Sequence, residues 1–168
     1  MSDPDGASSS WSRRASYPIR ADRCTVFNLI TEVELWPVLF RHIRSARVLR
    51  RNGRRRLIAV KVRWKGLPLG YMAIQTIDDE AFETTIQHVS PITRGSITTW
   101  SVRPADDADP AHSAVELRLE QKLTVRVPLV GGILANVLIG RLIARDLGRQ
   151  MARRVQEIAE GGSLAGRD

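Results

Sequence analysis

The stretch GILANVLIGRLIARDLGRQMARRVQEIAE, Gly132 to Glu160, decides the fold, because it predicts one long helix that closes over a sheet made by everything before it. Glycine pairs at 131–132 and 161–162 bound the stretch, and glycine commonly marks helix boundaries. In its second half, apolar residues recur at the three- and four-residue spacing of an amphipathic helix. These residues are Leu147, Met151, Val155 and Ile158.

The first half of the predicted helix, Ile133 to Ala144, is apolar on almost every side. One sheet face covers only one side of a helix, so a second element must contact it. Neighbouring loops or a partner copy are two candidates, and a lid over a ligand cavity or a membrane contact is the functional alternative. Glycine, asparagine and arginine interrupt the apolar run, which falls short of the roughly 20 residues that a membrane-spanning helix needs.

Length and composition predict one domain. The chain has 168 residues, 43% of them hydrophobic, which suffices for a core but leaves no room for a second domain. We expect this domain at residues 16–160. Residues 1–15 lack the apolar core of a signal peptide and predict a disordered N-terminal tail, and residues 161–168 predict a flexible C-terminal tail.

Cysteine and histidine usage argues against disulfides and metal sites. Cys24 is the one cysteine, so an internal disulfide is excluded and a reducing cytoplasm fits best. The three histidines lie far apart in sequence, at His42, His88 and His112, and no spacing of these residues matches a metal site. We therefore expect a cytoplasmic protein with no metal and no cofactor, and peripheral membrane contact as an alternative.

Positive charge is concentrated in one segment. Residues 41–65 contain eleven Arg and Lys and no Asp or Glu, so their +11 exceeds the net +8 of the chain. A basic hairpin of this kind predicts an acidic partner reached through Arg54, Arg55 and Arg56. An acyl carrier protein and an anionic membrane are the candidates, and a solvated face without a partner is the alternative. Nucleic acid is disfavoured, because the cluster has no interleaved aromatics and no recognition helix.

The middle of the chain predicts strands, since its hydrophobic pattern has a period of two from Ile43 onward. Short turns such as Asn52-Gly53 separate the runs, which makes neighbouring strands antiparallel. Before them, Asp22 is a good N-cap for a first helix, and Pro37 begins a second short one. These elements predict an α+β fold, in which a curved antiparallel sheet of about seven strands wraps the final helix.

The alternation also places two polar residues on apolar strand faces. Gln121 shares a face with Val115, Leu117 and Leu119, and His88 ends the inward face of its own strand. Each is either a satisfied polar group of the core or rim, or a group that fixes a ligand in an apolar cavity.

The order of these features resembles a known superfamily over roughly residues 17–160. The opening helix with Val33-Glu34-Leu35-Trp36-Pro37, the strand of Trp100 followed by Pro104, and the long final helix are similar to the START-like (SRPBCC) superfamily, in its polyketide cyclase/dehydrase and coenzyme Q-binding branch. The resemblance implies a helix-grip fold: a seven-stranded curved antiparallel sheet around a long C-terminal helix, with two short helices after the first strand. It also implies a deep ligand cavity lined by Trp36, Trp64, Tyr71, His88, Trp100 and Gln121.

One departure bears on activity. The resemblance implies an arginine on a central strand, which polarises a carbonyl in the polyketide cyclases of this branch. Around the corresponding strand, Leu69 to Asp78, this chain has Gln75, Thr76 and Ile77 instead. The resemblance implies a protein that binds a hydrophobic molecule, a polyketide or a product derived from one during antibiotic biosynthesis, as cyclase or as chaperone. The alternatives are a non-catalytic lipid or quinone carrier acting at membranes and a self-resistance protein that sequesters a reactive natural product.

Overall fold

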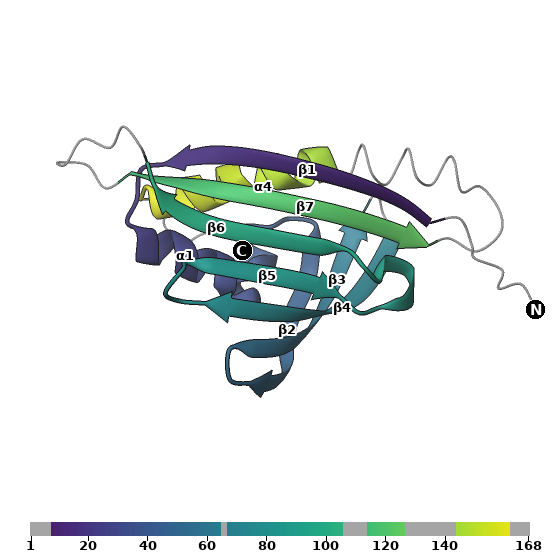
Figure 1. The fold of residues 1–168 in the computed structure, drawn as a ribbon. Coiled ribbons are helices and arrows are strands. Elements are labelled where there is room, and N and C mark those ends of the chain that lie inside the picture. Colours follow the sequence, from purple (N-terminus) through teal and green to yellow (C-terminus); the bar gives the residue numbers. More distant parts are fainter. Residues whose placement is uncertain (1–7, 65–66, 106–113, 127–143, 162–168) are drawn as a thin grey trace, which may run out of the picture.

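The computed structural model describes residues 8–64, 67–105, 114–126 and 144–161. Its elements follow the order predicted from the sequence (Figure 1). They are β1 (Ser8–Ile19), α1 (Arg23–Thr31), the 3-10 turn η1 (Val33–Leu35), α2 (Trp36–Leu39), β2 (Ile43–Asn52), β3 (Arg55–Trp64), β4 (Leu67–Asp78), β5 (Glu83–His88), the 3-10 turn η2 (Pro91–Thr93), β6 (Ile97–Pro104), β7 (Val115–Arg126) and α4 (Ala144–Ala159).

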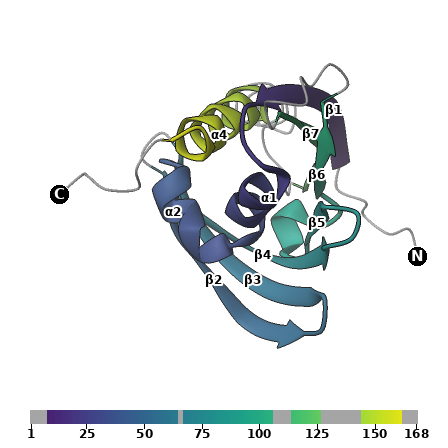
Figure 2. The ribbon, with the colours of Figure 1, turned by 90° about the vertical axis from the view of Figure 1, so that its left-hand side faces the viewer.

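The strands form one antiparallel sheet in the order β1-β7-β6-β5-β4-β3-β2. Only β1 enters out of sequence order, beside β7, and every other neighbouring pair is consecutive along the chain. The sheet curves strongly, and α1 and α4 lie on its concave side (Figure 2). The predicted α+β architecture with a curved seven-stranded antiparallel sheet is therefore confirmed.

The two short helices after β1 begin where the sequence predicts. Asp22 is the N-cap of α1, since its Oδ1 accepts a hydrogen bond of 2.8 Å from the backbone N–H of Thr25, which satisfies one of the free N–H groups at the helix start. Pro37 lies in the first turn of α2, where the missing N–H costs nothing. No helix in the described ranges is long and apolar enough to span a membrane.

Two predicted boundaries change. The C-terminal helix was expected from Gly132 to Glu160, whereas the described helix α4 has 16 residues, Ala144–Ala159, and the apolar segment 133–143 lies outside the described residues. The disordered tail was expected to reach residue 15, but β1 begins at Ser8 and pairs with β7 along its whole length. The pairing explains this difference: a polar, serine-rich segment forms a strand because β7 offers it a complete ladder of backbone partners.

Alternate residues of each strand form the inner face of the sheet, the face toward the helices. In β7, Leu117 and Leu119 are buried while Arg118 and Glu120 are exposed, as predicted. In β1 the half-buried Tyr17 lies opposite Leu117, so the same alternation continues into the added strand. The core therefore lies between this inner face and the packed sides of α1, α2 and α4.

The turn before β5 holds a strained residue. Phe82 has φ of 52°, in the left-handed region that side chains with a Cβ seldom adopt. Three contacts hold it there: its ring meets Phe27 of α1 edge-on at 5.3 Å, the Arg23 guanidinium lies 3.9 Å above it, and its carbonyl accepts a hydrogen bond of 2.9 Å from the Val102 N–H. Helix α1 is thereby fixed to the ends of β5 and β6.

The strain predicts an unusual order of stability at position 82. Phe82→Gly and Phe82→Ala both lose the ring contacts, but only glycine adopts a positive φ freely. We expect Phe82→Gly to be more stable than Phe82→Ala by about 0.5–1 kcal/mol in urea denaturation. A more stable alanine variant, the usual order within an ordinary turn or strand, would contradict the assigned conformation.

Candidate functional site

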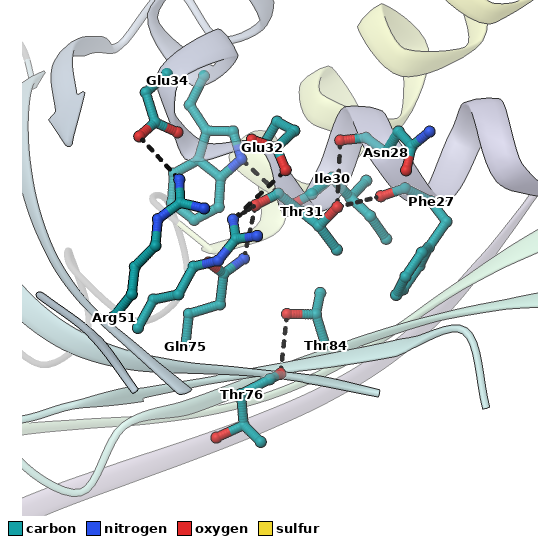
Figure 3. Close-up of polar contacts among 12 residues, drawn as sticks. Phe27, Asn28, Ile30, Thr31, Glu32, Glu34, Arg51, Gln75, Thr76 and Thr84 are labelled. Carbon is teal, nitrogen blue, oxygen red and sulfur yellow. Dashed lines mark hydrogen bonds and ion pairs between the residues drawn. The ribbon is translucent and has the colours of Figure 1, made fainter. Parts of the chain in front are cut away.

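The C-terminus of α1 is held over the sheet by two side chains that converge on one carbonyl (Figure 3). Gln75 Nε2 of β4 donates a hydrogen bond of 3.0 Å to the Thr31 carbonyl, and Arg56 Nη1 of β3 donates one of 3.4 Å to the same oxygen. The last carbonyls of a helix lack partners within the helix and carry the negative end of its dipole. A buried amide and a cation therefore satisfy this end and fix where α1 lies.

Gln75 has a second, unused polar atom. Its side chain is fully buried, and its Oε1 has no hydrogen-bond partner among the residues that the structure describes. The amide cannot be turned around, because its NH₂ group is needed as the donor to Thr31. A buried acceptor left in this state costs free energy, so a donor placed beside Gln75 would be stabilising.

Tyr71 and His88 form the clearest pair among the predicted site residues. They lie on the inner faces of β4 and β5, at the ends of these strands away from Phe82, and their rings stack at 4.3 Å with 16° between the planes. His88 Nδ1 lies 3.1 Å from the Thr93 hydroxyl. Among the described residues, nothing bonds to His88 Nε2 or to the Tyr71 hydroxyl.

Both members of the pair are uncharged at neutral pH. Burial lowers the pKa of His88 to about 4, and burial raises the pKa of the Tyr71 hydroxyl above its usual value. The tyrosine thus keeps its proton as a donor. The His88 tautomer that accepts from Thr93 leaves Nε2–H as a donor, and the other tautomer leaves Nε2 as an acceptor.

A second polar group lies on the inner face of β6, β7 and β1. Gln121 Nε2 donates to the Thr98 hydroxyl at 3.5 Å, and Arg13 lies directly opposite Gln121 in the ladder between β1 and β7. Arg13 is half-buried and donates to the Tyr17 hydroxyl at 3.4 Å. In the register, Thr98 lies opposite Ile86, the residue two before His88. The two polar groups are therefore diagonal neighbours on one apolar face.

The other predicted residues occupy different places. Trp36 is buried, and its indole N–H donates to the Ile30 carbonyl at 3.3 Å, so the tryptophan holds α2 against α1. Trp100 is buried on the inner face between Thr84 and Leu119. The side chain of Trp64 lies outside the described set. The structure thus brings together Tyr71 with His88, and places Gln121 nearby.

Sequence reasoning missed Arg13, Thr98 and the role of Gln75. Arg13 was assigned to the tail, although its alternation with Ala15 and Tyr17 is the signal of an inward-facing position. Thr98 shares its face with Trp100 two residues on, which the period of two already indicates. No sequence pattern identifies Gln75 as the partner of Thr31, because 44 residues separate them.

The arrangement of these inner-face side chains is suited to binding a small molecule. Within the part of the chain that the structure describes, no group of three His, Cys, Asp or Glu side chains could hold a metal ion. An apolar face with a few hydrogen-bonding groups is typical of a small-molecule site.

Comparison with known proteins identifies the family of the chain. The family model described as polyketide cyclase / dehydrase and lipid transport matches residues 19–154. The chain belongs to this family. The match contains α1, β2 to β7 and the stacked Tyr71–His88 pair, so it spans the fold and the candidate site. Among curated protein sequences, none matches the chain.

Solved structures show the same fold at low sequence identity. TTHA0849 from Thermus thermophilus is 19% identical with a TM-score of 0.72, covering 88% of this chain and 99% of that one. The Zhui aromatase/cyclase from Streptomyces sp. R1128 is 13% identical with a TM-score of 0.69, covering 92% and 100%. A START superfamily protein from Mycobacterium smegmatis is 15% identical with a TM-score of 0.68, covering 90% and 99%. The START-like resemblance is therefore confirmed at the level of the fold.

The lowered histidine pKa values predict acid sensitivity. Burial lowers the pKa of His42 and of His88 from 6.5 to about 4. Between these values the unfolded chain binds protons that the folded chain does not, so stability falls as the pH drops from 6.5 to 4. We expect this fall to be less steep in His88→Phe, which keeps a ring against Tyr71 but has nothing to protonate.

Urea denaturation of both proteins at a series of pH values from 7 to 4 measures this slope. Carboxylates contribute equally to the two series, so the difference reports His88 alone. Parallel slopes in wild type and variant would show that His88 titrates normally.

Proposed function

We propose that this protein binds a hydrophobic small molecule against the inner face of its sheet, and that the molecule is a polyketide or a product derived from one. The observation that carries the proposal is the stacked Tyr71–His88 pair, whose hydroxyl and Nε2 have no partner among the described residues on an otherwise apolar face. Membership of a polyketide cyclase and lipid transport family supports the same class of ligand.

The polar groups of the inner face suit a ligand that carries several oxygen atoms, rather than a plain hydrocarbon. Neighbouring strands are about 4.8 Å apart, so inward groups on β4, β5, β6 and β7 recur across the sheet at steps of that size. Tyr71, Thr98 and Gln121 would bond to carbonyl, enol or phenol oxygens spaced along a flat molecule.

The same groups allow a role in cyclisation as well as in binding. Closing a ring in a poly-β-ketone requires a bent chain and a donor for the developing oxyanion. Protons between two carbonyls are already acidic, so a strong general base is not required. In this proposal Tyr71 and His88 hold the bent chain, and the hydrogen-bonding groups of Tyr71, Thr98 and Gln121 stabilise the developing oxyanion.

Carriage of a lipid or quinone is the second candidate. It is favoured by a mixed basic and apolar surface on the outer side of β2 to β4, described below, which would let the protein visit a membrane. Whether the ligand is oxygen-rich or a prenyl chain decides between the two, because only the first uses the hydroxyl of Thr98 and the amide of Gln121.

Binding of emodin, a polyhydroxylated anthraquinone, tests the first candidate through quenching of tryptophan fluorescence. We expect saturable binding that Tyr71→Phe and Thr98→Val each weaken about 5- to 10-fold, the effect of losing one hydrogen bond. Thr99→Val is the matched control, since Thr99 is the next residue of β6 and faces outward, where its hydroxyl lies 3.2 Å from that of Thr85.

If Thr98→Val and Thr99→Val weakened emodin binding equally, the inner face would not be the binding site. Tighter binding of a prenylated quinone than of emodin, unaffected by Thr98→Val, would favour the carrier instead.

A further inference from the structure

The outer face of the sheet is electrically divided. On the outer sides of β1, β5, β6 and β7, three cations are paired with acids: Arg14 with Glu120 at 3.1 Å, Arg118 with Glu116 at 2.6 Å, and Arg103 with Glu83 at 3.9 Å. Lys122 of β7 is exposed and forms no ion pair among the described residues. The sequences of β2 and β3 contain no acidic residue. The net positive charge of the protein therefore projects from one half of this face.

The three arginines nominated from the sequence divide into different roles. Arg54 forms ion pairs with Asp78 at 3.8 Å and Glu80 at 3.2 Å. Arg56 points inward and is committed to Thr31 and Glu32. Of the three, only Arg55 is exposed and without a partner among the described residues. Apart from Arg55, the charges available to a partner must come from other residues of β2 and β3.

Five exposed cations supply that charge, and within the described residues none of them makes an ion pair or a side-chain hydrogen bond. We call them the basic face: Arg47, Arg50, Arg55, Lys61 and Arg63. The register of β2, β3 and β4 places all five on the side opposite the buried Ile58 and Val60.

Apolar side chains lie between these cations. Arg47 of β2 lies opposite Ala59 of β3, which lies opposite Met72 of β4. In the same way, Arg50 of β2 lies in line with Leu57 of β3 and Ile74 of β4. Met72 is 44% exposed, and Leu49, in the β-bulge beside Arg50, is 45% exposed. Side chains this apolar are usually exposed singly, so a group of them among cations without counter-ions marks an interaction surface.

We propose that the basic face docks on an anionic lipid surface. The cations would lie among lipid headgroups while Met72 and Leu49 enter the boundary between headgroups and acyl chains. This goes beyond the proposed function, because it rests on outward residues alone and holds for any ligand. Tyr71 and His88 alternate with the outward Met72 and Gln87, so docking brings the inner site within one sheet thickness of the membrane where hydrophobic molecules dissolve.

A lipid surface fits these observations better than an acidic protein. The cations are spread over two strands without acids among them, and lipids rearrange to meet any such pattern, whereas a protein must match fixed positions. The half-exposed Met72 and Leu49 gain from leaving water in an acyl layer at about 25 cal/mol per Å². An acidic protein partner is therefore the competing outcome.

Co-sedimentation with vesicles tests the proposal with the full chain. The probe is vesicles of phosphatidylcholine with one third phosphatidylserine, against pure phosphatidylcholine. We expect binding to the anionic vesicles only, weakening as salt rises. Neutralising three cations by Arg47→Gln, Arg50→Gln and Lys61→Gln should lower the partition coefficient about 100-fold, and Met72→Ser should lower it about 5-fold.

The matched control removes the same charge from the paired half, through Arg14→Gln, Arg103→Gln and Arg118→Gln. Surface ion pairs contribute little to folding, so this variant should fold and bind vesicles within about 3-fold of wild type. Urea denaturation of every variant confirms that it is folded.

Equal losses of vesicle binding in the two triple variants would overturn the proposal, because binding would then depend on the net charge of the protein and not on the basic face. So would failure to bind anionic vesicles, including the case in which the chain binds a polyglutamate peptide instead. A loss confined to the basic face variants and to Met72→Ser supports it.

Discussion

The position of α1 depends on one carbonyl. Thr31 ends the helix, and Gln75 and Arg56 meet its oxygen from two neighbouring strands. These two hydrogen bonds hold one end of α1, and the contacts of Phe82 with Phe27 and Arg23 hold the other end. The helix is thereby fixed over the central strands, away from Tyr71 and His88. Gln75 is one of three residues on the strand where the resemblance implies an arginine. It supports the helix, and its second polar atom is a hydrogen-bond acceptor rather than a cation.

The period of two along the strands separates the residues of the two proposed roles. Inward residues of β4 to β7 supply a few neutral polar groups within an apolar surface, which suits a ligand. Outward residues of β2 and β3 carry cations without counter-ions among the described residues, which suits an anionic surface. Because Tyr71 and Met72 are adjacent in sequence but on opposite faces, one short segment contributes to both proposed sites. In a curved sheet with helices on its concave side, the basic face and the inner face are the two sides of the same strands.

Local patterns in the sequence predicted the sheet, its antiparallel order and the start of α1, since alternation, turn residues and the Asp22 cap act over a few positions. They did not predict the part of β1 before residue 16, because a serine-rich segment becomes a strand only through its partner β7. The same limit applies to the site. The stacking of Tyr71 on His88 joins residues of neighbouring strands, and the commitment of Arg56 to Thr31 depends on contacts far apart in the chain.

A crystal structure of the protein with bound emodin tests the central claim most directly, because it locates the ligand relative to both faces of the sheet. The account predicts the ring system against the inner face, with an oxygen within hydrogen-bond distance of the Tyr71 hydroxyl, the Thr98 hydroxyl or Gln121. An emodin molecule found only on the outer face, or an inner face whose Tyr71, Thr98 and Gln121 are covered by other side chains with no space between, would contradict it.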